Sequence, residues 1–297
     1  MNLTQLPETD QESVSQITDA LAKTTVSFKR RVVERLVVAA LGSIPWVGGF
    51  IGAAASLKIE QRGIARDSLQ SRWLAEHARK MESLSQTLAD LASQLGSLGP
   101  QLEERLSSES YLSLVRSAFR AWDAAETEEK RQLVASLLVR SAGARLCADD
   151  VVHLFIDWLG QYHETHFAVI REVFSHPGAT RKGIWLSLYG SPAREDSAEA
   201  DLYRLLIRDL SAGGVIRQER NTTAEGRFMR KRGGAAGHDR DGPDQVLLES
   251  AFEDAKPYVL TGLGRQFVYY TMGGDAAALS AELQLDGIRQ QSHAGGV

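Results

Sequence analysis

The sequence predicts a mainly α protein whose C-terminal domain adds a small β element, and three observations lead to this prediction. Apolar side chains recur every three or four residues over much of the chain before residue 212. Glycine and proline clusters end these helical patterns, as at residues 96–100 and 176–178. Short strand-like stretches occur only late in the chain, at residues 215–218 and from residue 258.

We expect four consecutive parts. They are a helical N-terminal module, a helical bundle, a C-terminal domain and a tail, over residues 1–100, 101–160, 161–275 and 276–297. Within the first part lie an apolar hairpin, residues 36–57, and a coiled-coil-like helix, residues 64–95. A chain of 297 residues is long enough for two or three domains, each with its own core.

Composition excludes several classes of protein. The formal net charge is −4, so no general positive field recruits nucleic acid. The single cysteine, Cys147, excludes an internal disulfide and a cysteine-rich zinc site, and it favours a reducing compartment. The acidic, polar N-terminus does not resemble a secretory signal. We therefore expect the protein on the cytoplasmic side of the bacterial inner membrane, or alternatively free in the cytoplasm.

The first segment of note is the run from 36 to 57, which has no charged side chain. As one helix it would match a bilayer core, but Pro45 and the following glycines predict a turn at residues 44–49. Basic residues flank both ends, which favours an inserted hairpin with both ends on one side. A buried hairpin of a soluble core is the alternative. The residues assigned to the membrane hairpin are Leu36, Val37, Leu41, Ile44, Pro45, Trp46, Phe50 and Ile51.

The next helix carries apolar residues at alternating spacings of three and four, the period of a coiled coil. This heptad seam comprises Leu74, Met81, Leu84, Leu88, Leu91 and Leu95, with His77 as its polar member. Such a seam serves either self-association into a homo-oligomer or packing against another helix of the same chain. Residues 101–160 then predict a compact bundle, with Thr127 and Asp149 near the starts of two of its helices.

The C-terminal domain predicts three helices, a glycine turn at Gly213 and Gly214, a strand, a polar loop and a returning strand. The third helix is expected to turn Leu202, Leu205, Leu206 and Leu210 inward. The stretches LYRLLIRDLSAGGVIRQER and YVLTGLGRQFV resemble the end of many bacterial winged helix-turn-helix domains. That resemblance covers about 110 residues and implies a fold, not a function.

The whole layout is also loosely similar to uncharacterised bacterial proteins associated with phage defence. In those proteins an apolar N-terminal segment precedes helices with an "EEKR…LL" stretch, which here starts at Glu128. The resemblance implies a membrane effector with a C-terminal sensing domain. It transfers no residue with an established role.

The third helix is a poor candidate for reading DNA, because acids such as Glu199 and Asp201 crowd its N-terminal end. The loop from 217 to 240 is different, since it holds seven basic and three acidic side chains. It could bind a nucleotide, an oligonucleotide or anionic lipid, or be a solvated loop. The residues assigned to ligand or nucleic-acid binding are Arg204, Arg208, Arg217, Arg220, Arg227, Arg230, Lys231 and Arg232.

No catalytic residue, metal site or cofactor is predicted. The pair His163 and His166 lacks the spacing of a zinc-protease motif, and the glycine cluster lacks the lysine and hydroxyl of a phosphate loop. The favoured function is a membrane-associated effector of pore or channel type, acting in antiviral defence. Its partners would be other copies of itself, lipid, a nucleotide or oligonucleotide, and a protein encoded nearby. The alternatives are a soluble DNA-binding regulator or adaptor, and a scaffold that acts through the heptad seam.

Overall fold

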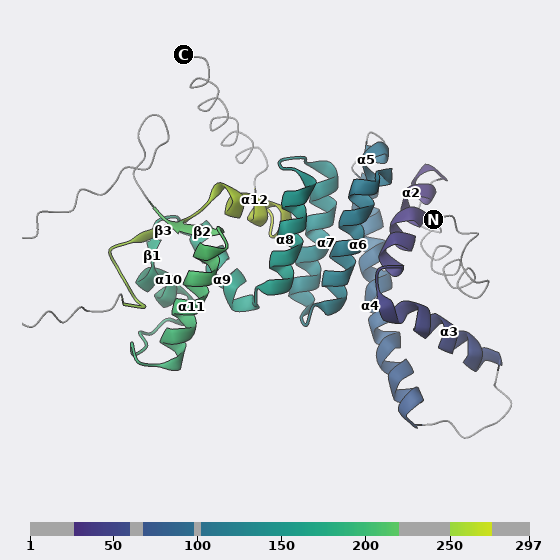
Figure 1. Ribbon diagram of the computed structural model, residues 1–297, viewed down its shortest axis with the longest axis horizontal. Helices are drawn as coiled ribbons and strands as arrows, with labels where there is room; N and C mark the ends of the chain where they lie inside the picture. The colour runs from purple at the N-terminus through teal and green to yellow at the C-terminus, as the bar shows by residue number, and fades with distance from the viewer. Residues whose placement is uncertain (1–26, 60–67, 98–101, 220–249, 275–297) are drawn as a thin grey trace, which may run out of the picture. The chain divides into compact units, whose positions relative to one another are not determined.

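The computed structural model describes residues 27–59, 68–97, 102–219 and 250–274. Within these residues the chain is mainly helical, as predicted, with one small antiparallel sheet of three strands (Figure 1). The chain divides into two compact units, Met1–Gln161 and Tyr162–Val297, called unit 1 and unit 2 below. Residues on both sides of the expected boundary at residue 100 belong to unit 1.

Unit 1 is built from helices packed around α6. Its helices are α2 (Ser27–Leu41), α3 (Pro45–Ile59), α4 (Ser68–Ser97), α5 (Glu103–Ser107), α6 (Glu109–Ala124), α7 (Glu128–Gly143) and α8 (Asp149–Gln161). Helix α6 contacts α2, α5, α7 and α8. Its apolar stripe is buried from Tyr111 to Trp122, and the Tyr111 hydroxyl donates a hydrogen bond of 2.9 Å to the Leu138 carbonyl of α7. The predicted amphipathic pattern therefore forms the centre of the unit.

Hydroxyl caps and one ion pair define the helix ends in this unit. Ser108 and Thr127 cap α6 and α7, each accepting a hydrogen bond from a backbone N–H three residues on. Asp149, the first residue of α8, forms a bidentate ion pair with Arg105 of α5, at 2.8 and 2.5 Å. The Arg105 side chain is 10% exposed and that of Asp149 22%. This pair joins two helices that are far apart in the sequence.

The turn of the apolar hairpin lies earlier than the sequence predicted. Helix α2 ends at Leu41, and α3 begins at Pro45 and continues through Gly48 and Gly49, so the expected turn at 44–49 is wrong. Proline is compatible with the first turn of a helix, because its missing N–H would have no partner there. Pro45 therefore starts the second arm and does not separate the arms.

Unit 2 surrounds α9 and a small sheet. Its elements are α9 (Glu164–Ser175), β1 (Ala179–Thr180), α10 (Arg181–Tyr189), α11 (Ala198–Ala212), β2 (Ile216–Gln218), β3 (Pro257–Leu260) and α12 (Gly262–Thr271). The strand order is β1-β3-β2, with both pairs antiparallel and Ile216 opposite Leu260. Strand β1 was not predicted, because two residues are too few to show an alternating pattern.

The glycines and Thr261 near the sheet have a specific packing role. Gly214 has φ +77°, a left-handed conformation that glycine adopts without strain. Its carbonyl accepts a hydrogen bond of 2.6 Å from the Thr261 hydroxyl, which also caps α12 by accepting from the Gly264 N–H. A Cβ atom on Gly264 would overlap the Val215 carbonyl oxygen. The L-T-G-L-G stretch thus fixes α12 against the start of β2.

Helix α11 turns a different face inward from the one expected. Leu206 and Leu210 are buried as predicted, but Leu202 is 48% exposed and Leu205 39%. Tyr203 occupies the inner face instead, and its hydroxyl donates a hydrogen bond of 2.7 Å to the Arg181 carbonyl. Leu206 and Leu210 lie three and seven residues after Tyr203 and share its helix face, whereas Leu202 and Leu205 lie one before and two after it and face another direction.

Candidate functional site

The second arm of the hairpin, α3, is apolar on every side, and within residues 45–52, whose side chains the structure describes, only one side is buried. Its only charged residue is Lys58. Val47 and Ile51 are buried, and α3 packs against α4 (Figure 1). Gly48, Gly49 and Gly52 are exposed, and a Cβ atom added to Gly48 or Gly49 would meet no described residue within 4 Å. A helix that is apolar all round is normally enclosed by protein or by lipid.

Trp46 anchors this arm to the centre of unit 1. Its indole Nε1 donates a hydrogen bond of 2.7 Å to a carboxylate oxygen of Asp123, near the end of α6. Its ring also meets the edge of His77 on α4, with 5.0 Å between ring centroids, and that of Phe50 at 6.4 Å. Trp46 and Phe50 are both partly exposed. The hydrogen bond to Asp123 thus ties the turn of the hairpin to a helix far along the chain.

The other predicted hairpin residues lie inside unit 1. Leu36, Val37, Leu41 and Ile44 are all buried, while Pro45 is exposed. Within the described part of the chain, no one helix has the length and apolar character to cross a bilayer. Glu34–Leu41 and Pro45–Gly52 meet that standard only as a pair, bent by 96°. The structure therefore presents the hairpin docked, with its first arm covered by protein.

The heptad seam is used within the same unit. Leu84, Leu88, Leu91 and Leu95 are at most 4% exposed, and α4 contacts α2, α3 and α7. Met81 is partly buried, and the side chain of Leu74 lies outside the described residues. Packing within the chain, one of the two alternatives left open by the sequence, accounts for these four leucines.

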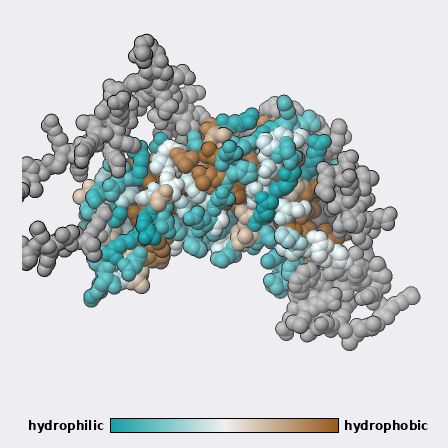
Figure 2. Space-filling model, viewed as in Figure 1, coloured by the Kyte–Doolittle hydropathy of each residue, from teal (hydrophilic) through white to brown (hydrophobic). Residues whose placement is uncertain are grey.

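In unit 2, the predicted basic residue on the first half of α11 is held by acids. The Arg204 guanidinium donates hydrogen bonds to Asp201 at 2.7 Å and to Glu195 at 2.5 Å. Glu195 also accepts from the Ala251 N–H at 3.0 Å, after the basic loop. Hydrophilic side chains cover most of the face of unit 2 seen in Figure 2. The Arg204 guanidinium is thus already bound by two carboxylates, which makes it a poor candidate for binding a nucleic-acid phosphate.

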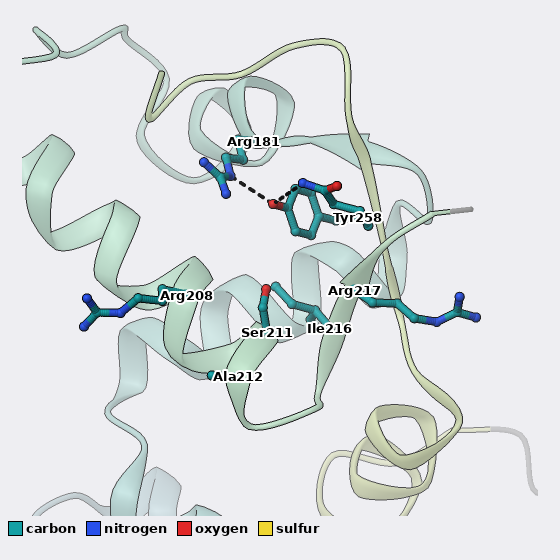
Figure 3. A pocket seen from close by; sticks show the side chains of 8 residues that line it. Arg181, Arg208, Ser211, Ala212, Ile216, Arg217 and Tyr258 are labelled. Carbon is teal, nitrogen blue, oxygen red and sulfur yellow. Dashed lines mark hydrogen bonds between the residues drawn. The ribbon is translucent and has the colours of Figure 1, made fainter. Parts of the chain in front are cut away.

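Two other predicted basic residues, Arg208 and Arg217, line one pocket of about 540 Å³ (Figure 3). The remaining loop residues assigned to ligand binding, Arg220, Arg227, Arg230, Lys231 and Arg232, lie outside the described residues. The pocket adds side chains that the sequence did not single out. They are Arg181, Ser211, Ala212, Ile216, Gln218 and Tyr258.

The floor of this pocket is Tyr258 of β3, whose side chain is buried. Its hydroxyl oxygen accepts hydrogen bonds from Arg181 Nε at 3.0 Å and from Gln218 Nε2 at 3.3 Å. Figure 3 shows Arg181 beside the Tyr258 hydroxyl, while Arg208 and Arg217 extend outward on opposite sides. The sequence marks Tyr258 only as the start of a strand, and the pairing of β1 with β3 is what brings it beside Arg181.

The histidine pair forms a helix cap. His166 is buried in α9, and its Nδ1 accepts a hydrogen bond of 3.1 Å from the His163 N–H at the start of that helix. The His166 ring stacks on Tyr162, with 5.0 Å between ring centroids. Within the described part of the chain, no group of three or more histidine, cysteine or acidic side chains is arranged to hold a metal ion.

Comparisons of the chain with models of protein families, with curated proteins and with solved structures found no match.

Proposed function

We propose that the protein is a bacterial membrane-associated effector whose α2–α3 hairpin binds lipid when it leaves its docked position. The observation that carries this proposal is the outer face of α3. It is apolar and bears Gly48 and Gly49, where an added Cβ atom would meet no described residue within 4 Å. Folded soluble proteins normally cover such a helix or give it a polar side.

In the proposed mechanism the docked hairpin is the resting form. When the hairpin leaves its docked position, Val47 and Ile51, which are buried in the docked form, become exposed. The hydrogen bond from Trp46 to Asp123 is broken at the same time. Lipid offers these apolar side chains an environment as favourable as the protein core. Released hairpins of several copies would then assemble at the inner face of the bacterial membrane as a pore or channel for antiviral defence. A protein encoded nearby could provide the trigger.

Unit 2 is proposed to be the sensing domain, with a winged-helix fold. Support comes from the order helix, strand, helix, helix, strand, strand, helix and from the strand order β1-β3-β2. A ligand of unit 2 can favour hairpin release only if it binds the released form more tightly than the docked form. The alternative function, a DNA-binding regulator or adaptor, has the same fold in its favour but the acids around Arg204 against it.

The proposal is tested by flotation of the full-length protein with vesicles of phosphatidylethanolamine and phosphatidylglycerol. Gly49→Asp places a charge on the exposed face of α3, where the added Cβ atom would meet no described residue within 4 Å. A charge at the centre of a membrane helix costs roughly 2.5–3.5 kcal/mol, so vesicle binding is expected to fall on the order of 100-fold. Aspartate favours the helix slightly more than glycine does, so the fold itself is unaffected.

The matched control is Gly160→Asp, which makes the same substitution at another exposed helical glycine of unit 1 with open space beside it. It changes net charge equally and is expected to bind vesicles like the wild type. Gly49→Ala, which adds a Cβ without charge, is also expected to bind. The proposal fails if the wild type does not float with vesicles, or if the two aspartate variants bind equally.

A further inference from the structure

Helix α11 of unit 2 carries apolar side chains on an exposed side as well as on its buried one. Leu202 is 48% exposed and Leu205 39%, and the two lie three residues apart on one face of the helix. Ala198 and Ala212 extend this face to the two ends of the helix, and both are exposed. Single exposed leucines are common on protein surfaces, whereas a row of apolar side chains along one helix indicates a contact face.

The spacing of this row is that of a coiled-coil seam. Its members lie at positions 198, 202, 205, 209 and 212, which are alternately four and three residues apart. We call this row the α11 seam. Its polar member is Asp209, which is partly exposed. A seam of this kind is covered by one further helix that lies along it.

The charges that border the α11 seam complement each other in an antiparallel pair of helices. Asp201 and Arg208 lie on the same border of the seam, about two helical turns apart. Their side chains are 74% and 73% exposed. When a two-fold axis relates two antiparallel helices, residues on the same border face each other. Asp201 of each copy then meets Arg208 of the other.

Both charges already have a partner on their own helix. Asp201 accepts a hydrogen bond from Arg204 at 2.7 Å, and Arg208 lies 3.5 Å from Asp209. Exposed pairs of this kind contribute little to stability, so their geometry can change at small cost. A carboxylate accepts several hydrogen bonds and a guanidinium has five N–H donors. These local pairs therefore do not prevent contacts with a second copy.

The seam residues favour the same antiparallel direction. In this register Leu202 of one copy lies beside Leu205 of the other, and Asp209 lies beside Ala198. A parallel pair would instead place the two Asp209 carboxylates beside each other, and like charges in contact across an interface are unfavourable. The row of apolar residues and the order of the charges thus fit a second copy of this helix.

We propose that two copies of the protein associate through antiparallel pairing of α11, with the α11 seam at the centre of the interface. One helix of 15 residues provides a small interface, so the dimer is expected to be in equilibrium with the monomer. Pairing through unit 2 would join two hairpins in one complex and raise their local concentration. The proposal does not depend on hairpin release, because none of its residues lies in α2 or α3.

The test is sedimentation velocity of the full-length protein, without lipid or detergent, over a range of protein concentrations. The wild type is expected to shift from monomer to dimer as the concentration rises. The double variant Leu202→Gln, Leu205→Gln is expected to weaken dimerisation on the order of 100-fold, because four partly exposed leucines lose their burial in each dimer. The matched control is Leu154→Gln, Leu186→Gln, which changes two leucines that are exposed on α8 and α10 and is expected to dimerise like the wild type.

The direction of pairing is tested by reversing charges. Asp201→Arg makes both border positions positive, and Arg208→Asp makes both negative, so each variant alone is expected to dimerise more weakly than the wild type. An equal mixture of the two variants should form heterodimers, because opposite charges then face each other at both contacts. In a parallel pair these two positions do not meet, so mixing would restore nothing.

The proposal is overturned if the wild type stays monomeric at every concentration, or if the double variant on α11 dimerises as tightly as the wild type. It is also overturned if the control on α8 and α10 weakens the dimer equally, which would indicate unspecific association of exposed leucines. A monomer that binds a short DNA duplex would make α11 a recognition helix instead. Thermal unfolding checks the fold of each variant, and if the double variant does not fold, the mixing experiment decides.

Discussion

Removing the carboxylate of Asp123 is expected to increase lipid binding, although the substitution changes no residue that would contact lipid. Asp123 lies on α6, outside the hairpin, and accepts the hydrogen bond from Trp46 Nε1 at 2.7 Å. Asp123→Ala therefore destabilises the docked form without altering any residue that would contact lipid. If docking opposes lipid binding, weaker docking should raise the apparent affinity for vesicles.

The magnitude follows from the type of hydrogen bond and its exposure. Hydrogen bonds to charged groups contribute roughly 1.5–3 kcal/mol. Both Trp46 and Asp123 are partly exposed, so water replaces the lost partner and the lower end of that range applies. About 1.5 kcal/mol corresponds to an increase of about tenfold in the released fraction. The buried contacts of Val47 and Ile51 persist, so release remains incomplete.

The assay is flotation with the same vesicles over a range of lipid concentration. Asp157→Ala removes the same charge from an exposed position on α8 and is expected to bind like the wild type. In a Trp46→Phe background the donor is already absent, so Asp123→Ala should have no further effect. The reasoning is refuted if the two alanine variants bind alike, or if Asp123→Ala raises binding equally in both backgrounds.

Two stability predictions test the packing of the units. Asp149→Asn is expected to lower the free energy of unfolding by about 2–3 kcal/mol at pH 7, because it breaks a largely buried bidentate pair with Arg105. The control is Asp150→Asn at the exposed neighbouring position, which is expected to change the free energy of unfolding by less than about 0.5 kcal/mol. The Arg105 hydrogen bonds hold the pKa of Asp149 below its usual value. This stabilisation is therefore present above about pH 4 and is lost as the pH falls through the lowered pKa. Urea unfolding followed by tryptophan fluorescence should show the unfolding free energies of the two variants converging in acid. Gly264→Ala is expected to lower the melting temperature of unit 2 clearly, since the added Cβ would overlap a backbone carbonyl. Gly262→Ala is the control and should leave that temperature nearly unchanged, because a Cβ atom there would meet no described residue within 4 Å. Equal melting temperatures would contradict the close approach of α12 to β2.

Several features of the fold follow from local patterns and were predicted from them. The stripe on α6 has the helical period, and Thr127, which was placed near a helix start, is a residue type that satisfies free N–H groups there. The Ser108 cap of α6 was not predicted. The glycine turn and the Thr261 cap in unit 2 likewise depend on neighbours in the chain. Local signals were misleading where they allowed two interpretations. Proline interrupts a helix in its interior but is favoured in its first turn, and Pro45 takes the second role at the start of α3.

The sequence by itself determined that the chain is mainly helical, that residues 36–57 are apolar, and that helices begin near Thr127 and Asp149. Only the tertiary structure decided which sides of those helices are covered. It buries Leu36 and leaves Gly49 open, joins Trp46 to Asp123, and brings Arg181 to Tyr258. The physical reason is that helix formation depends on residues within one or two turns, whereas burial and pocket lining depend on residues that meet across 70 or more positions of the chain.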